Sequence, residues 1–342
     1  MELGHTGVKL VDILSKLDKS NLKTILIVIY IFINLGQTTS ATQFSPSDVF
    51  AQVNHANQLT SELLKDKGIT DYKLPSSRES QANPMHVYEL HVSVLAELYK
   101  YALSEGFRPP PIVVSTPISY KPTDVYYLSE LVVKKLEEIH HAKLAFDETQ
   151  KNIYTNKTPV QVYQEVFELF YRLNLLNGNS KVSPSIVFSH VTRIREDLQT
   201  TLIFLSKKLE RSENNERKKR LLTTATFGTH PDGANLGNKS LGKTPADVIK
   251  LSFSIRESLN RLRAKYDLPR IEFPKEESFS KVLPVDVFLQ TQFIIAELNL
   301  IKQPMNINTT TNRGKLFKDK TPSDVFYVLQ HVDYMVERLL AM

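Results

Sequence analysis

The chain has 342 residues, of which 41% are hydrophobic and 23% are charged, a composition typical of a globular protein. It contains no cysteine, which excludes disulfides, thiol catalysis and every cysteine-based zinc or iron–sulfur site. The formal net charge of +6 is small for this length, so sequence-specific nucleic-acid binding is not expected.

Residues 1–41 have the pattern of an export signal. Lys23 precedes an unbroken apolar run at 25–33, and the small residues at 39–41 suit a cleavage site. We therefore expect a signal peptide and an exported protein, either periplasmic or extracellular. The alternative is an uncleaved anchor through residues 24–36, which would then be the protein's membrane contact. Against it, the apolar run is about half of the roughly 20 residues that a membrane-spanning helix needs.

One short motif recurs eight times after this segment, and each copy is typical of a helix start. In a capping motif, the side chain of a Ser or Thr accepts a hydrogen bond from an amide of the first turn. The following proline has no N–H, and an N–H at that position would have no partner in the helix. An acid at the third helical position lies near the positive end of the helix dipole. Aspartate stands at that third position in five copies. Capping therefore explains these carboxylates without a metal or catalytic site. The prolines are Pro46, Pro84, Pro122, Pro159, Pro184, Pro245, Pro284 and Pro322.

The apolar residues behind each proline fall at repeated offsets. Valine always stands three residues on, an aromatic residue or isoleucine four on, and further apolar residues ten and fourteen on. Steps of seven and four place these side chains on one face of a helix, as in bundle packing. The pattern therefore predicts that each repeat forms one helix of roughly 20 residues followed by a long linker.

The spacing of the motifs predicts the domain plan. Most prolines stand about 38 residues apart, and a polar break at 177–180 separates two groups of four. We expect an all-α fold of about eight long helices in two duplicated four-helix bundles. The first would cover 42–178 and the second 179–342, with an insertion at about 213–243. A division into five and three helices also fits the spacing.

The linkers mix proline with apolar residues, which favours extended chain docked on the helices. At about 3 Å per residue such a linker can run back along a helix, so successive helices can lie parallel. An up-down arrangement stays open.

Two sets of residues are candidates for binding. The position seven residues after each proline lies on the same apolar face, the seam of the bundle, and is polar in several copies. These polar residues could line a pocket inside a bundle, although buried polar groups are more commonly hydrogen-bonded within the core. These are His91, Ser129, Ser252 and Thr291. A basic stretch could contact an anionic partner, although it also suits a solvated helix end. It comprises Lys207, Lys208, Arg211, Arg217, Lys218, Lys219 and Arg220.

No catalytic or cofactor motif occurs in the sequence, so we expect no enzyme activity, no cofactor and no metal site. The repeat also differs from the tetratricopeptide, HEAT, armadillo and ankyrin patterns, whose units are helix pairs. The leading hypothesis is an exported, non-enzymatic helical-repeat scaffold or partner-binding protein. Its partner would be an unknown protein or an anionic polymer of the cell envelope. The alternatives are a periplasmic bundle that senses or carries a ligand, and an enzyme of unrecognised type.

Overall fold

The computed structural model describes residues 43–144, 152–179, 181–210, 240–275, 278–279 and 281–342. Within these ranges the fold is all-helical, and extended segments pair only at one bridge, between Ser115 and Thr311. Each helix begins at a proline of the repeated motif, which confirms the prediction of long single helices. The part of the chain that the structure describes contains eight helices: α3 (Pro46–Asp66), α4 (Pro84–Ser104), α5 (Pro122–Lys143), α6 (Pro159–Leu176), α7 (Pro184–Glu210), α9 (Pro245–Lys265), α10 (Pro284–Lys302) and α11 (Pro322–Ala341).

The helix starts are capped as the motif predicts. At α11, the Asp324 amide donates to the Thr321 hydroxyl (3.3 Å) and the Thr321 amide donates to the Asp324 carboxylate (2.8 Å). A side chain at the third position accepts from the capping residue's amide in seven helices. The eighth, α7, has Ile186 at this position and cannot close the pair.

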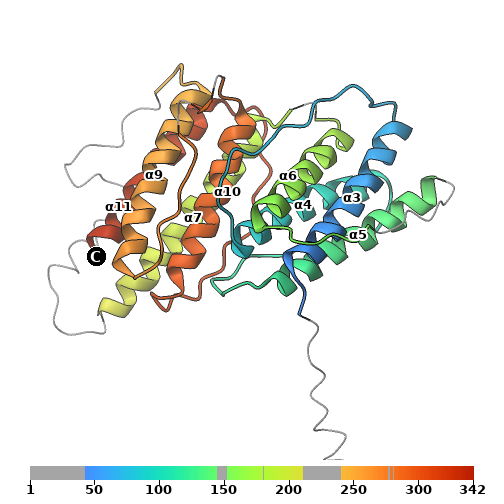
Figure 1. Ribbon diagram of the computed structural model, residues 1–342. Helices are drawn as coiled ribbons and strands as arrows, with labels where there is room; N and C mark the ends of the chain where they lie inside the picture. The colour runs from blue at the N-terminus through green and yellow to red at the C-terminus, as the bar shows by residue number, and fades with distance from the viewer. Residues whose placement is uncertain (1–42, 145–151, 180, 211–239, 276–277, 280) are drawn as a thin grey trace, which may run out of the picture. The chain divides into compact units, whose positions relative to one another are not determined.

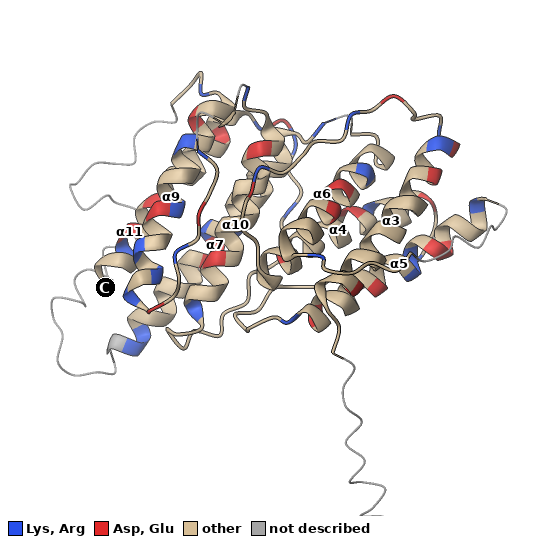
Figure 2. Ribbon diagram, in the orientation of Figure 1, with Lys and Arg blue, Asp and Glu red and all other residues tan. Residues whose placement is uncertain are grey.

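The helices pack in two groups of four (Figure 1). In the first bundle, α3 and α4 each contact α5 and α6; in the second, α7 and α9 each contact α10 and α11. In both bundles, each of the first two helices in chain order contacts each of the last two. This shared pattern is compatible with duplication of a four-helix unit. Acidic and basic residues are interspersed along both bundles (Figure 2).

All four helices of each bundle run in the same direction. The four prolines of the first bundle, with the valines three residues on, surround one small apolar depression, and those of the second bundle surround another. At the opposite end of the first bundle, Glu105 at the end of α4 pairs with Lys67 after α3 (2.6 Å) and with Lys143 of α5 (2.5 Å). The parallel arrangement that the linkers permit is therefore the one that forms.

The linkers return along the helices as extended chain. Beside α9, the Asn260 side chain bonds both backbone groups of Ile271, at 3.0 and 2.9 Å. Arg263 Nε donates to the Pro269 carbonyl at 2.8 Å. On α6, Gln164 Oε1 accepts from the Ser77 amide at 2.6 Å. These contacts dock two of the linkers on helices and show how parallel neighbours are connected.

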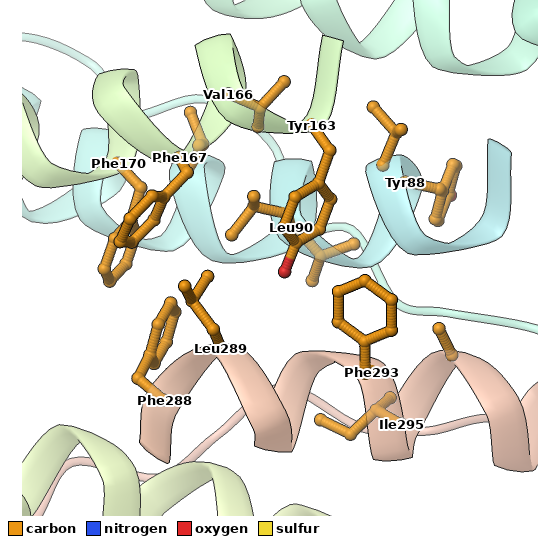
Figure 3. Close-up of a cluster of buried hydrophobic side chains, with 14 of the residues drawn as sticks. Tyr88, Leu90, Tyr163, Val166, Phe167, Phe170, Phe288, Leu289, Phe293 and Ile295 are labelled. Atoms are coloured by element: carbon orange, nitrogen blue, oxygen red, sulfur yellow. The ribbon is translucent and has the colours of Figure 1, made fainter. Parts of the chain in front are cut away.

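The two bundles meet where α4 and α6 face α10 (Figure 3). Phe170 stacks on Phe288 at 4.3 Å between ring centroids, and Tyr163 meets Phe293 edge-on at 5.1 Å. Because the pairs run in opposite order along the chain, α10 is antiparallel to α6. Most residues of α4 and α10 are buried, as expected for helices that pack against both their own bundle and the other one. Residues Phe44–Met342 form one compact unit.

Two sequence predictions fall wholly or mostly outside the described ranges: the export signal at 1–41 and the insertion at about 213–243. Among the described helices, none combines the length and apolar character required to cross a membrane.

Candidate binding cavity

A cavity of about 190 Å³ opens between α4, the first half of α7 and the segment 313–317 that precedes α11. It therefore takes side chains from both bundles. The polar residues that line it are Ser93, Glu97, Lys100, Asn179, Ser183, Ser185, Ser189, His190, Arg193, Arg313 and Lys315.

A hydrogen-bonded chain in the cavity wall fixes the tautomer of His190. The Ser93 hydroxyl donates to Gln292 Oε1 (3.0 Å), and Gln292 Nε2 donates to His190 Nδ1 (2.8 Å). Burial and the charges of Arg193 and Lys100 hold the pKa of His190 well below its usual value, so the ring is neutral at pH 7. Because Nδ1 accepts, the ring proton is on Nε2.

The Arg193 side chain connects the cavity to the buried interface between the bundles. Its Nη2 lies 3.3 Å from the Glu89 carboxylate, and its Nε donates to the Asn312 carbonyl. The same carboxylate accepts from Asn299 Nδ2 at 2.9 Å. Burial raises the pKa of Glu89, while the charge of Arg193 opposes that rise. Arg193 of α7 thus connects α4 to the chain before α11 beside the cavity.

The other charged side chains around the cavity differ in how far they are paired. Lys100 lies 2.6 Å from Glu97, and Lys315 lies 2.6 Å from Glu196. Arg313 stacks over the Tyr99 ring, 4.5 Å from its centroid, and has no carboxylate partner in the described part of the chain.

The chain before α11 is held against α7 by hydrogen bonds between its backbone and serine side chains of α7. The Ser189 hydroxyl donates to the Lys315 carbonyl at 2.5 Å, and the Ser185 hydroxyl accepts from the Lys320 amide at 3.1 Å. A Cβ atom at Gly314 would collide with the Ser189 hydroxyl oxygen, so a larger residue here would displace that hydroxyl from its bond to Lys315.

The four seam residues proposed as a pocket are buried in the bundle cores. In the first bundle, His91 Nδ1 contacts the Val87 carbonyl (2.9 Å) and its Nε2 contacts the Ser129 hydroxyl (2.8 Å). In the second bundle, Ser252 and Thr291 donate to backbone carbonyls of their own helices. None of the four lines the cavity described above.

The basic stretch is described only in part. Lys207 and Lys208 are exposed in the last turn of α7, where positive charge complements the helix dipole. The remaining candidates lie outside the described residues: Arg211, Arg217, Lys218, Lys219 and Arg220.

A buried charged cluster between the bundles was not expected from the sequence. Arg256 Nη1 donates to Glu79 (2.9 Å) and to Gln290 (2.6 Å), and Arg256 Nε lies 3.4 Å from Glu297. Burial, followed by the charges of Arg256 and Arg263, lowers the pKa of the neighbouring His86 well below its usual value. The available signal was Glu297 itself, because it stands in the middle of a helix that is otherwise largely apolar.

The cavity residues were also missed, although α7 carried a signal. Its motif is the one in which an apolar residue, Ile186, replaces the side chain that closes the cap elsewhere. In the described ranges, no three His, Asp or Glu side chains are grouped so as to hold a metal ion. Comparison with known proteins gives no match to a protein family, to a curated protein or to a solved structure.

Proposed function

We propose that this protein is a non-enzymatic binding protein, an exported helical scaffold that presents the cavity between α4, α7 and residues 313–317 to a partner. One contrast carries the proposal. The polar seam positions inside the bundles are packed and hydrogen-bonded, whereas polar side chains from both bundles converge on the open cavity. A concave site with a few convergent polar groups on a rigid body is typical of binding.

The chemistry of the cavity favours binding over catalysis. A serine nucleophile needs a histidine base that accepts its proton. Here the Ser93 hydroxyl donates to Gln292 and the Ser189 hydroxyl donates to the Lys315 carbonyl. The depressed pKa of His190 also makes it a weak base.

The test is a position-specific cross-link. A photoreactive side chain in place of Leu316, an exposed residue of the cavity rim, is illuminated in an extract of the producing cells. The same group at Ile153, which is exposed and does not line the cavity, serves as the control. Intact-mass spectrometry identifies the adduct. We expect one defined adduct at position 316 and none of that mass at position 153.

A second variant assigns the adduct to the cavity. Ala96 lines the cavity and is partly exposed, so Ala96→Leu reduces its volume without opening the core. We expect this variant to lose the adduct while keeping its thermal midpoint. An adduct that forms equally at both positions, or that persists in the filled variant, contradicts the proposal.

A further inference from the structure

We infer that the group taken up by the cavity is an oxyanion, a phosphate or carboxylate group of the partner. This inference rests on the proposed function, because it specifies what the cavity recognises. The volume of about 190 Å³ is comparable to that of an engineered protein cavity, roughly 150 Å³, which takes up one benzene molecule. The cavity therefore has room for one phosphate or carboxylate group, and the rest of a larger partner would extend beyond the rim.

The charge balance of the lining favours an anion. Four cationic side chains, Lys100, Arg193, Arg313 and Lys315, face a single lining carboxylate, that of Glu97. Glu89 and Glu196 offset two of these cations from outside the cavity. Arg313 remains uncompensated within the described ranges, and a guanidinium is suited to bidentate contact with a phosphate or carboxylate.

Neutral donors add to this positive lining. His190 is neutral at pH 7 because its pKa is lowered. Its Nδ1 accepts a hydrogen bond from Gln292, so its Nε2 carries the proton and is a neutral donor. In the other seven described helices, the side chain at the third helical position accepts a hydrogen bond from the amide of the capping residue. At the start of α7 this position is Ile186, so the Ser183 amide does not have this acceptor. His190 and Ser183 both line the cavity, and the positive end of the 27-residue α7 dipole lies there too.

The absence of cysteine allows a single reporter to be placed at the rim. Leu316→Cys is labelled with an environment-sensitive fluorophore and titrated at constant ionic strength. The probes are inorganic phosphate, succinate, uncharged glycerol and cationic ethylamine. We expect saturable responses to phosphate and succinate and none to the other two. The relative affinities of phosphate and succinate then distinguish the two oxyanions.

Arg313→Gln, combined with the label, tests the cation that has no partner. Losing a charge-assisted hydrogen bond to the anion should weaken binding at least about tenfold, with the thermal midpoint unchanged. The matched control is Lys318→Gln, because Lys318 is an exposed cation that directly follows this segment and does not line the cavity. We expect this control to bind both oxyanions like the parent.

Three results would overturn the inference: no saturable response to either oxyanion, equal responses to glycerol or ethylamine, or equal weakening by Arg313→Gln and Lys318→Gln. The cross-link at position 316 separates this failure from that of the proposed function. If the adduct forms and depends on the open cavity while oxyanions do not bind, the partner site stands and only its chemical class is wrong. If the cavity-dependent adduct also fails to form, both fall.

Discussion

Glu297 makes the stability of the protein depend on pH in a predictable direction. Its carboxylate is buried at the interface between the bundles, and neither oxygen has a hydrogen-bond partner among the described residues. The nearest cation, Arg256, is shared with Glu79. Burial raises the pKa of Glu297 from 4.5 to about 7, although the charges of Arg256 and Arg263 oppose this rise.

The size of the effect follows from this shift. The folded state holds the proton more tightly than the unfolded chain, so the contribution of Glu297 to stability is greatest below pH 4.5. It is lost as the pH rises toward about 7 and is constant above that value. At about 1.4 kcal/mol per pKa unit, the loss is on the order of 3 kcal/mol.

The assay compares the parent with Glu297→Gln, which keeps the shape of the side chain and removes its titration. Urea denaturation at a series of pH values from about 4.5 to 8 gives the free energy of unfolding of each protein. We expect the difference to shift by about 3 kcal/mol in favour of the glutamine variant as the pH rises. Titrating groups that do not interact with Glu297 cancel in the difference. A difference that stays constant over this range would refute the assignment.

Two further predictions test the core and the caps. Leu136→Ala and Leu259→Ala should each lower the free energy of unfolding by about 2–5 kcal/mol, because both side chains are fully buried. Glu257→Ala, which removes an exposed ion pair, should change it by less than about 0.5 kcal/mol, and equal losses would show that the seam is misplaced. Thr321→Ala should cost about 1 kcal/mol, whereas Lys121→Ala at the start of α5, where the side chain makes no cap bond, should cost almost nothing. Equal losses in urea melts would contradict the capping account.

The helices could be predicted from the sequence because their determinants are local. A cap, a proline and an apolar stripe lie within one helix, and all eight starts follow from them. The direction of the helices could not be predicted in the same way. Long linkers permit a parallel bundle, but only contacts such as those of Asn260 with Ile271 determine that a linker returns along its own helix.

The charged cluster and the cavity were not predicted because they depend on a second packing face of a helix, the one that contacts the other bundle. The repeat marks the face that each helix turns toward its own bundle. Arg256 follows the seam residue Ile255 directly, so its place in the repeat gives no reason for it to be buried. It is buried because the other bundle and the returning linkers cover it. Similarly, Ser93 and His190 are connected only when α4 packs against α10, because Gln292 of α10 bonds both side chains.

The parallel arrangement explains why acids recur at the helix starts, and in the second bundle α7 is the helix that lacks one. Four helix dipoles that point the same way gather about half a positive charge each at one end, and acids in the first turn offset this charge. Aspartates accordingly occupy the starts of α9, α10 and α11 in the second bundle. The first turn of α7 has none, so its positive end is not offset by its own motif. That end lines the cavity beside Arg313, which is why an external anion is the group best suited to complete it.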